Sequence, residues 1–349
     1  MNGFEFELKQ GGRATIDFMV NIFHGSATLT KAVRKDADKA AGNIDELPDD
    51  LDERNHFMVN SLVDSRPFRI YQLLGEWHSV NHGEAAINAF EEIQPDLQDQ
   101  LDQLSKGPTK IQIDEDFKAP AYWQGVEFHR TAKAWDGHPY MGFIHGEIIH
   151  RRIVGALFID GITKQRPEVA AMAPKDSYER ILEMGCSSGH YTQALALTYP
   201  DAEITGIDLS LTMLEHSQRT ANLKGWKWHL YQRAAEDTKF ESNQFDLVTS
   251  FILLHEMPVD AIEKMFTEAF RVLKPGGDLL MSDATRYSDL NKLEQWKADR
   301  GAAYGGEPYW RETASIDFAP MLEAAGFINV SSGGMNGAKY PYLIQGTKP

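Results

Sequence analysis

A glycine-rich turn between a buried strand and a helix constrains the fold of this chain more than any other feature. The segment from Arg180 to His190 begins as a buried strand and turns sharply into a helix that continues to about Tyr199. Gly185 and Gly189 lie in the turn, where they free the backbone to approach a ligand without side chains in the way. A tight connection without a ligand is the simpler alternative. The position of the turn predicts a ligand site at the carboxyl end of the strand.

The segments after the turn continue the alternation that is typical of a parallel sheet with crossover helices. A second strand, Glu203 to Ile207, ends at Asp208, which lies 23 positions beyond Gly185. A carboxylate about 20 residues after such a turn often receives the ribose hydroxyls of an adenosine cofactor. The other role open to this acid is to cap the next helix. Residues 245–254 and 278–282 supply further buried strands.

Four motifs in the second half resemble those of the class I S-adenosylmethionine-dependent methyltransferases, in the family's order and spacing. They are Glu183-Met-Gly-Cys-Ser-Ser-Gly189, Gly206-Ile-Asp-Leu-Ser210, Phe245-Asp-Leu-Val248 followed by Leu254-His-Glu256, and Leu273-Lys-Pro-Gly-Gly277. A dinucleotide-binding oxidoreductase is the competing interpretation, but Glu183 and the last motif fit the methyltransferases better. The resemblance implies an α/β fold, with a Rossmann-like methyltransferase domain over residues 176–349. Its sheet is expected to be mostly parallel, with a terminal antiparallel strand.

The resemblance also implies which residues bind S-adenosylmethionine. The implied positions are Glu183, Gly185, Cys186, Ser187 and Gly189 for the methionine part, Asp208 for the ribose, Leu209 and Met213 for the adenine, Ala235 and Glu236 for the loop at the adenine edge, and Ser250 and Phe251 beside the methionine group. One position departs from the family pattern. Ala234 stands where many relatives carry an aspartate for the adenine amine, and Glu236 or Asp237 is the substitute to consider.

Residues 1–175 read as a mainly helical domain, because apolar residues recur there at helical spacing. Pro167 and Pro174 lie in the connection to the second half and place the boundary near residue 175. The cofactor domain serves many substrates and does not name one. We therefore expect the helical half to cap and bind the acceptor, and we consider it as a surface for forming a homodimer.

One predicted helix of this half carries candidate acceptor-binding residues. It begins near residue 139, and His145, Ile149 and Arg152 lie on it at i, i+4 and i+7, hence on one face. With Tyr140 just before it, this face could present hydrogen-bonding groups and a guanidinium to an anionic small molecule. The alternative is that His145 is satisfied in the core between domains and that Arg152 bonds to helix carbonyls or to an acid.

Three further candidates come from the second half. His255 follows the fourth strand, beside the expected position of the cofactor's methyl group, and would act as a general base or would hydrogen-bond the substrate; capping or packing is the alternative. Tyr309 and Trp310 lie where related enzymes often place a substrate lid, although they could equally anchor a surface loop.

No compact metal-ligand spacing occurs, since His145 and His150 are five apart and would face differently on a helix. We expect no metal.

The layout of a long helical half before an acidic methyltransferase domain is similar to the bacterial enzymes that S-methylate 4-methylthio-2-hydroxybutyrate on the route to dimethylsulfoniopropionate. A thioether sulfur needs no base, so positioning and exclusion of water would suffice. The main alternative is an O-methyltransferase of phenolic or other secondary metabolites that uses His255 as its base. A cofactor-binding regulatory protein without catalysis is the alternative outside enzymology.

Composition excludes several other classes. The 35 basic and 51 acidic residues give a net charge of -16, which argues against binding to nucleic acid and to anionic membranes. No run of about 18 apolar residues suggests a membrane span, and the first residues lack the features of a secretory signal. The single cysteine, Cys186, excludes an intramolecular disulfide and a cysteine-based zinc site. The expected location is the reducing cytoplasm.

Overall fold

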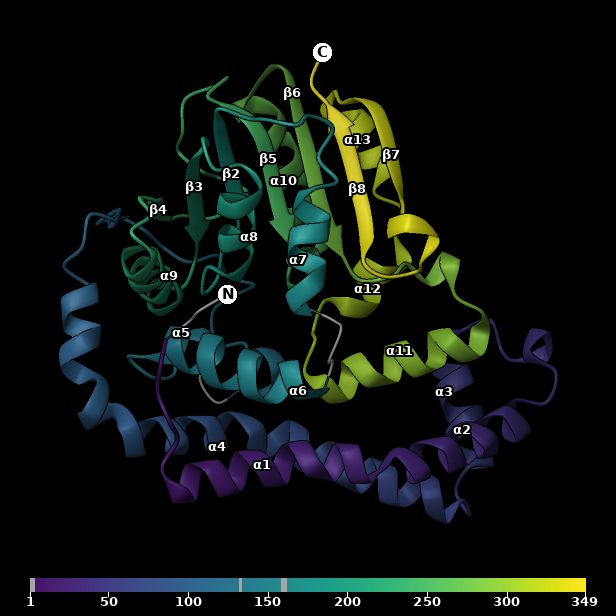
Figure 1. Cartoon of the computed structure of the whole chain (residues 1–349). Coiled ribbons are helices and arrows are strands. Elements are labelled where there is room, and N and C mark those ends of the chain that lie inside the picture. The colour runs from purple at the N-terminus through teal and green to yellow at the C-terminus, as the bar shows by residue number, and fades with distance from the viewer. Residues whose placement is uncertain (1–3, 132–133, 158–161) are drawn as a thin grey trace.

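The computed structural model describes residues 4–131, 134–157 and 162–349. A twisted sheet with helices on both faces forms one part, and long helices from the first half of the chain lie below it in Figure 1. The carboxyl ends of the central strands point toward these helices. No helix among the described residues is long and apolar enough to cross a membrane.

The sheet has eight strands in the order β1-β4-β3-β2-β5-β6-β8-β7. The strands are β1 (Lys110–Ile113), β2 (Arg180–Met184), β3 (Glu203–Asp208), β4 (His229–Gln232), β5 (Phe245–Phe251), β6 (Leu273–Asp283), β7 (Ile328–Gly334) and β8 (Tyr342–Thr347). The neighbours from β1 to β6 pair in parallel, while β8 is antiparallel to both β6 and β7. The predicted α/β fold with a terminal antiparallel strand is confirmed.

Alternating side chains of the buried strands supply two cores, one on each face of the sheet. Leu182 faces the core under α10 and α13, whereas its neighbour Ile181 faces the core under α7 and α8. The helices of this part are α7 (Ile162–Ala170), α8 (His190–Thr198), α9 (Leu211–Lys224), α10 (Val259–Val272), α11 (Lys292–Gly305), α12 (Trp310–Ser315) and α13 (Ala319–Ala325).

The first half is mainly helical, and its long helices run side by side beneath the sheet (Figure 1). It contains α1 (Gln10–Gly25), α2 (Ala27–Ala41), α3 (Leu51–Ser61), α4 (Arg66–Leu104), α5 (Met141–Phe143), η4 (Ile144–Val154) and α6 (Gly155–Leu157). α1, α4 and η4 share one apolar core, in which Phe90 and Phe143 are fully buried. η4 lies between this layer and the strand ends.

One strand of the sheet comes from the first half. β1 pairs with β4 in parallel register, from Lys110 with His229 to Ile113 with Gln232. This strand was not predicted, because four residues at an exposed sheet edge show too little apolar alternation in the sequence. The helical segments before residue 110 are therefore connected to the sheet through an edge strand as well as through the chain near residue 175.

Candidate active site

A cavity of about 640 Å³ lies between the carboxyl ends of β2, β3 and β5 and the helix η4. Both halves of the chain contribute to its walls, with Glu183 and Asp208 from the sheet and His145 and Ile149 from η4. Clefts of this size at the carboxyl ends of parallel strands commonly bind small ligands.

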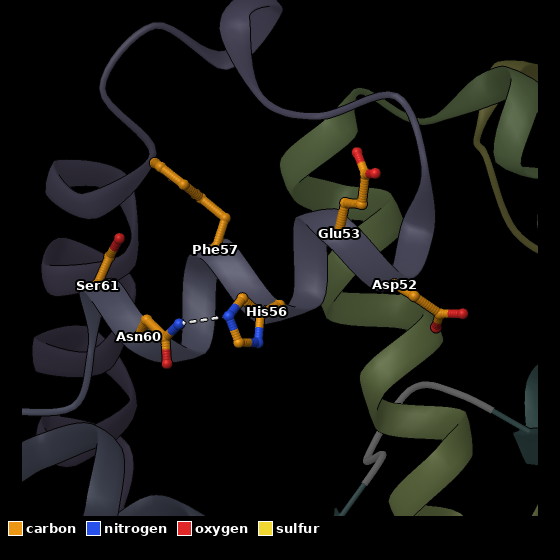
Figure 2. A pocket seen from close by; sticks show the side chains of 6 residues that line it. All are labelled: Asp52, Glu53, His56, Phe57, Asn60 and Ser61. Atoms are coloured by element: carbon orange, nitrogen blue, oxygen red, sulfur yellow. Dashed lines mark hydrogen bonds between the residues drawn. The ribbon is translucent and has the colours of Figure 1, made fainter.

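A second hollow lies on the exposed side of α3, where Figure 2 shows the side chains that line it. All of them come from one helix: Asp52, Glu53, His56, Phe57, Asn60 and Ser61. The His56 ring is hydrogen-bonded to Asn60 of the next turn at 2.9 Å. Because no second element among the described residues contributes groups that converge on this hollow, the cavity at the strand ends is the candidate active site.

The turn after β2 adopts the backbone that its glycines permit. Gly185 and Gly189 have φ values of 72° and 83°, and Ser187 between them also has a positive φ of 46°. A Cβ atom on Gly185 would lie 2.8 Å from the Leu253 side chain, so a larger residue would displace the loop after β5. The glycine therefore permits close packing at the cavity as well as the turn itself.

Nine of the twelve predicted cofactor residues line the cavity. They are Glu183, Gly185, Cys186, Ser187, Asp208, Leu209, Met213, Ala235 and Phe251. The other three lie beside it. Gly189 is the N-cap of α8 and packs on Ser217. Glu236 accepts a hydrogen bond from the Tyr122 hydroxyl at 3.1 Å, and Ser250 is buried within β5. The positions of all twelve are compatible with binding along the strand ends.

Two buried carboxylates fit the polar parts of S-adenosylmethionine. Asp208 accepts hydrogen bonds from the backbone N–H groups of Ser187 at 2.8 Å and Ser210 at 2.9 Å. Burial nevertheless raises the pKa of Asp208 to about 7, and burial raises the pKa of Glu183 to about 8. Oε2 of Glu183 has no hydrogen-bond partner among the described residues. A ligand with a cationic ammonium group would supply one and would favour the ionised carboxylate.

His255 lies at the cavity with a carboxylate on each side. Its Nδ1 is 3.1 Å from Oδ1 of Asp283, the last residue of β6, and its Nε2 is 3.8 Å from Oε2 of Glu307. Burial alone would lower the pKa of His255, but the two carboxylates outweigh it and raise the pKa to about 9. At neutral pH the ring is therefore an imidazolium, which is able to donate a hydrogen bond from each nitrogen.

The helix that carries His145 is a π-helix, and this changes which side chains share a face. In η4 the hydrogen bonds run from i to i+5, so the turns are wider than in an α-helix. His145 and Ile149 line the cavity as expected, but His150 and Val154 join them in place of Arg152. Instead, Nη2 of Arg152 donates to the carbonyl oxygen of Phe6 at 2.9 Å.

Two more predicted acceptor residues lie outside the cavity lining. The Tyr140 hydroxyl accepts a hydrogen bond from Gln98 at 2.7 Å, and the Tyr309 hydroxyl donates to the carbonyl oxygen of Tyr122 at 2.8 Å. Trp310, by contrast, lines the cavity and packs edge-on against His255 at 5.1 Å between ring centroids.

The sequence analysis missed a basic cluster on the cavity wall, formed by Arg166 of α7 with His150 and His190. Nη2 of Arg166 donates to Nδ1 of His150 at 3.1 Å, and its guanidinium lies over the Phe251 ring at 5.3 Å. His150 also lies close to His145, at 4.3 Å between ring centroids, which corrects the expectation that residues five apart would face differently. Arg166 sits in a Pro-containing connection whose sequence gives no periodic signal of its orientation.

Burial keeps the histidines of this cluster neutral. It lowers the pKa of His145 to about 3 and lowers the pKa values of His150 and His190 well below their ordinary range. Because a guanidinium only donates, Nδ1 of His150 must accept, and its proton is therefore on Nε2. In the described part of the chain, no group of three or more His, Cys, Asp or Glu side chains is arranged to hold a metal ion.

Comparisons with known proteins agree with this geometry. The profile of a family described as a methyltransferase domain matches residues 181–277. A ubiquinone/menaquinone biosynthesis C-methyltransferase from Allorhizobium ampelinum is 30% identical over 224 residues, which are 58% of this chain and 81% of that protein. The chain belongs to the class I S-adenosylmethionine-dependent methyltransferases. The family prediction is thereby confirmed over the competing oxidoreductase, and S-adenosylmethionine is the cofactor of this methyltransferase.

Other relatives of the methyltransferase match over shorter segments. The malonyl-[acyl-carrier protein] O-methyltransferase of Legionella pneumophila is 33% identical over 120 residues, and the fatty-acid O-methyltransferase of Mycolicibacterium smegmatis is 34% identical over 121 residues. These matches cover 34% and 35% of this chain and only 39% and 43% of the relatives. A putative O-methyltransferase structure from Nostoc punctiforme has the same fold, with a TM-score of 0.50 and 16% identity over 94% of this chain and 97% of that chain.

Proposed function

We propose that this methyltransferase transfers a methyl group to the thioether sulfur of a small carboxylate, as in the S-methylation of 4-methylthio-2-hydroxybutyrate. Bound S-adenosylmethionine would supply an activated methyl sulfonium. Glu183 would hold its ammonium group and Asp208 its ribose hydroxyls. The new bond to the acceptor sulfur forms as the old carbon–sulfur bond breaks, no proton is released, and the positive charge passes to the product.

The position of the Arg166 guanidinium is the observation that carries this proposal. Its guanidinium reaches the cavity beside Phe251, which is predicted to lie next to the methionine part of the cofactor. Burial lowers the pKa of Arg166 to about 10, so the side chain remains charged at neutral pH. A buried guanidinium favours a carboxylate, which it can bind through two parallel hydrogen bonds.

The histidines beside Arg166 favour an acceptor that has polar groups to bind and that reacts without losing a proton. Nδ1 of His145 and Nε2 of His190 are buried without a hydrogen-bond partner in the described residues, so acceptor oxygens would satisfy them. The low pKa values of these rings make them poor bases, and the imidazolium of His255 has no free lone pair. A thioether nucleophile requires no proton removal, so it can react in a site whose histidines are poor bases.

O-methylation with His255 as general base is the second candidate function. The hydrogen bond from His255 to Asp283 favours it, because a carboxylate that orients an imidazole is common in enzymes that deprotonate a hydroxyl. On this interpretation the ring would need to lose its proton before each turnover, and activity would rise with pH toward 9.

A methyl-transfer assay with labelled cofactor distinguishes these functions. The acceptor panel should contain thioether hydroxy acids, catechols and amines. We expect transfer to 4-methylthio-2-hydroxybutyrate and no transfer to catechol. Transfer to catechol alone would support the O-methyltransferase, and cofactor binding without transfer to any acceptor would favour the regulatory protein.

We also propose that residues 1–175 act as the acceptor cap, because η4 carries His145 and His150 into the cavity. The helix α7, which packs on the sheet, adds Arg166 from the same segment of the sequence. A cytoplasmic location and a homodimer remain proposals from the sequence.

A further inference from the structure

An alternating series of acids and histidines runs along one wall of the cavity. We call Asp283, His255, Glu307, His129 and Glu256 the ion-pair chain. Nδ1 of His129 is 2.6 Å from Oε1 of Glu307, and its Nε2 is 3.1 Å from Oε1 of Glu256. With the contacts of His255 to Asp283 and to Glu307, the series is continuous. Every member except Asp283 lines the cavity.

The ion-pair chain joins segments that are distant in the sequence. His129 belongs to the cap, in a short 3₁₀ turn (Phe128–Arg130), whereas His255 and Glu256 follow β5 and Glu307 follows α11. His129 and Arg130 have positive φ values of 53° and 54°, a conformation that costs free energy in residues other than glycine. The backbone N–H of His129 also donates to the carbonyl oxygen of Gly306 at 3.1 Å. Contacts to the loop before Glu307 therefore hold the cap turn in place.

Glu307 is the member that contacts both histidines. Its Oε1 pairs with His129, while its Oε2 is 3.8 Å from Nε2 of His255, which is too long for a hydrogen bond. Oε2 of Glu307 accordingly has no hydrogen-bond partner among the described residues. The carboxylate of Glu307 therefore attracts the charged ring of His255 without accepting a hydrogen bond from its Nε2. The proton on Nε2 remains available to a ligand in the cavity.

The surroundings of each histidine are dominated by these carboxylates. Asp283, Glu307 and Glu256 face His255 from three elements, and the Trp310 ring covers one edge. Asp283 itself is compensated by Arg286, at 3.5 Å, and by the N–H groups of Leu254 and Ala284.

Around His129, the opposite charges are Glu307 and Glu256. The histidines nearest to it, His82, His145 and His150, have pKa values below the ordinary range, because burial disfavours their charged forms. Glu307 lies within 4 Å of both charged rings, whereas Glu256 contacts His129 and acts on His255 at longer range.

We propose that Glu307 is a positioning residue, which holds His255 as a hydrogen-bond donor toward the acceptor and ties it to His129 of the cap. The inference rests on the proposed function for the identity of the acceptor. Removal of the Glu307 charge should loosen the cap turn and let His255 lose its proton at lower pH. The acceptor would then bind beside a ring that no longer donates from a fixed position.

The experiment compares Glu307→Gln and Glu307→Asp with a matched control, Glu312→Gln, which removes an exposed carboxylate five residues away. Histidine titrations followed by NMR on ¹³C-labelled protein are assigned with His129→Gln and His255→Gln. Activity is measured with 4-methylthio-2-hydroxybutyrate, and cofactor affinity by calorimetry.

In Glu307→Gln we expect the titration midpoints of His129 and His255 to fall by about one pH unit or more, as loss of a close opposite charge predicts. We expect kcat to fall about tenfold, the low end of the range for losing a charged hydrogen-bonding group. Cofactor affinity should stay within about twofold, since a group away from the cofactor carboxylates contributes little to their binding. Glu307→Asp should restore part of both effects, and Glu312→Gln should change neither.

Unchanged midpoints in a folded Glu307→Gln variant would overturn the inference. A fall in kcat with unchanged midpoints would also overturn it, because Glu307 would then act by another route. If the wild-type protein methylates no thioether, the proposed function fails, and the titrations still decide whether Glu307 controls the two rings.

Discussion

If Glu183 and Asp208 bind the cofactor as proposed, its affinity should depend on pH. Burial raises their pKa values to about 8 and about 7, so both carry protons below pH 7 in the free protein. S-adenosylmethionine brings positive charge and favours the ionised forms, and protons are therefore released on binding. Calorimetry should show that the Kd falls as the pH rises from 6 to 9. The same series with Glu183→Gln should be flatter, and an equally steep series would contradict the role of this carboxylate.

Asp208 can be tested at a single pH. Asp208→Ala should weaken S-adenosylmethionine binding by about 1–3 kcal/mol, the range for removing a hydrogen-bond partner of this kind. NAD should bind neither protein. An unchanged cofactor affinity in a variant with an unchanged melting temperature would remove Asp208 from the ribose site.

Arg166 and Arg152 form a matched pair for testing acceptor recognition. Arg166 reaches the cavity, whereas Arg152 bonds to the Phe6 carbonyl outside it. Lysine cannot reproduce the two parallel bonds of a guanidinium, so Arg166→Lys should raise the KM for a carboxylate acceptor by about tenfold or more. Cofactor affinity should be near normal. Arg152→Lys should leave the acceptor KM and the cofactor affinity unchanged. A raised KM in Arg152→Lys but not in Arg166→Lys would contradict this and would place the acceptor at the face of Arg152 that the sequence predicted.

At the scale of single elements, the central strands β2, β3, β5 and β6 and the glycine turn followed from the sequence because they depend on local patterns, while β1 and β4 were not predicted. Most of the predicted cofactor positions line the cavity. The face of η4 did not follow from the sequence. A spacing of 3.6 residues places Arg152 beside His145, but the i to i+5 bonding of η4 selects His150. η4 packs against α4 and, through Glu147 and His216, against α9, and no local signal in the sequence specifies this packing.

The packing of this segment gives an element-scale prediction. A Cβ atom on Gly142, just before η4, would lie 2.2 Å from the carbonyl oxygen of Thr212 in α9. Gly142→Ala should therefore destabilise the protein by about 1–3 kcal/mol, as overpacking does. Gly75→Ala in α4 is the control, since nothing lies within 4 Å of its added methyl group and alanine favours a helix. Denaturant unfolding of both variants gives the comparison, and equal stability would show that α5 and α9 separate easily.

At the scale of the whole molecule, the sequence predicted a helical half and a cofactor half but not how they combine. β1 enters the sheet from the first half, and the ion-pair chain joins His129 to residues after β5 and α11. Contacts between residues more than a hundred positions apart have no local sequence signal. Deletion of residues 1–175 would remove a strand together with the cap, so point variants test the cap more cleanly than truncation.

The pH dependence of methyl transfer to 4-methylthio-2-hydroxybutyrate, measured as kcat at saturating cofactor, tests the central claim most directly. A thioether loses no proton, and His255 stays charged up to about pH 9. We predict transfer with a kcat that is nearly constant from pH 6 to 8. Absence of transfer, or a kcat that rises with pH in the wild type and no longer does so in His255→Ala, would contradict it.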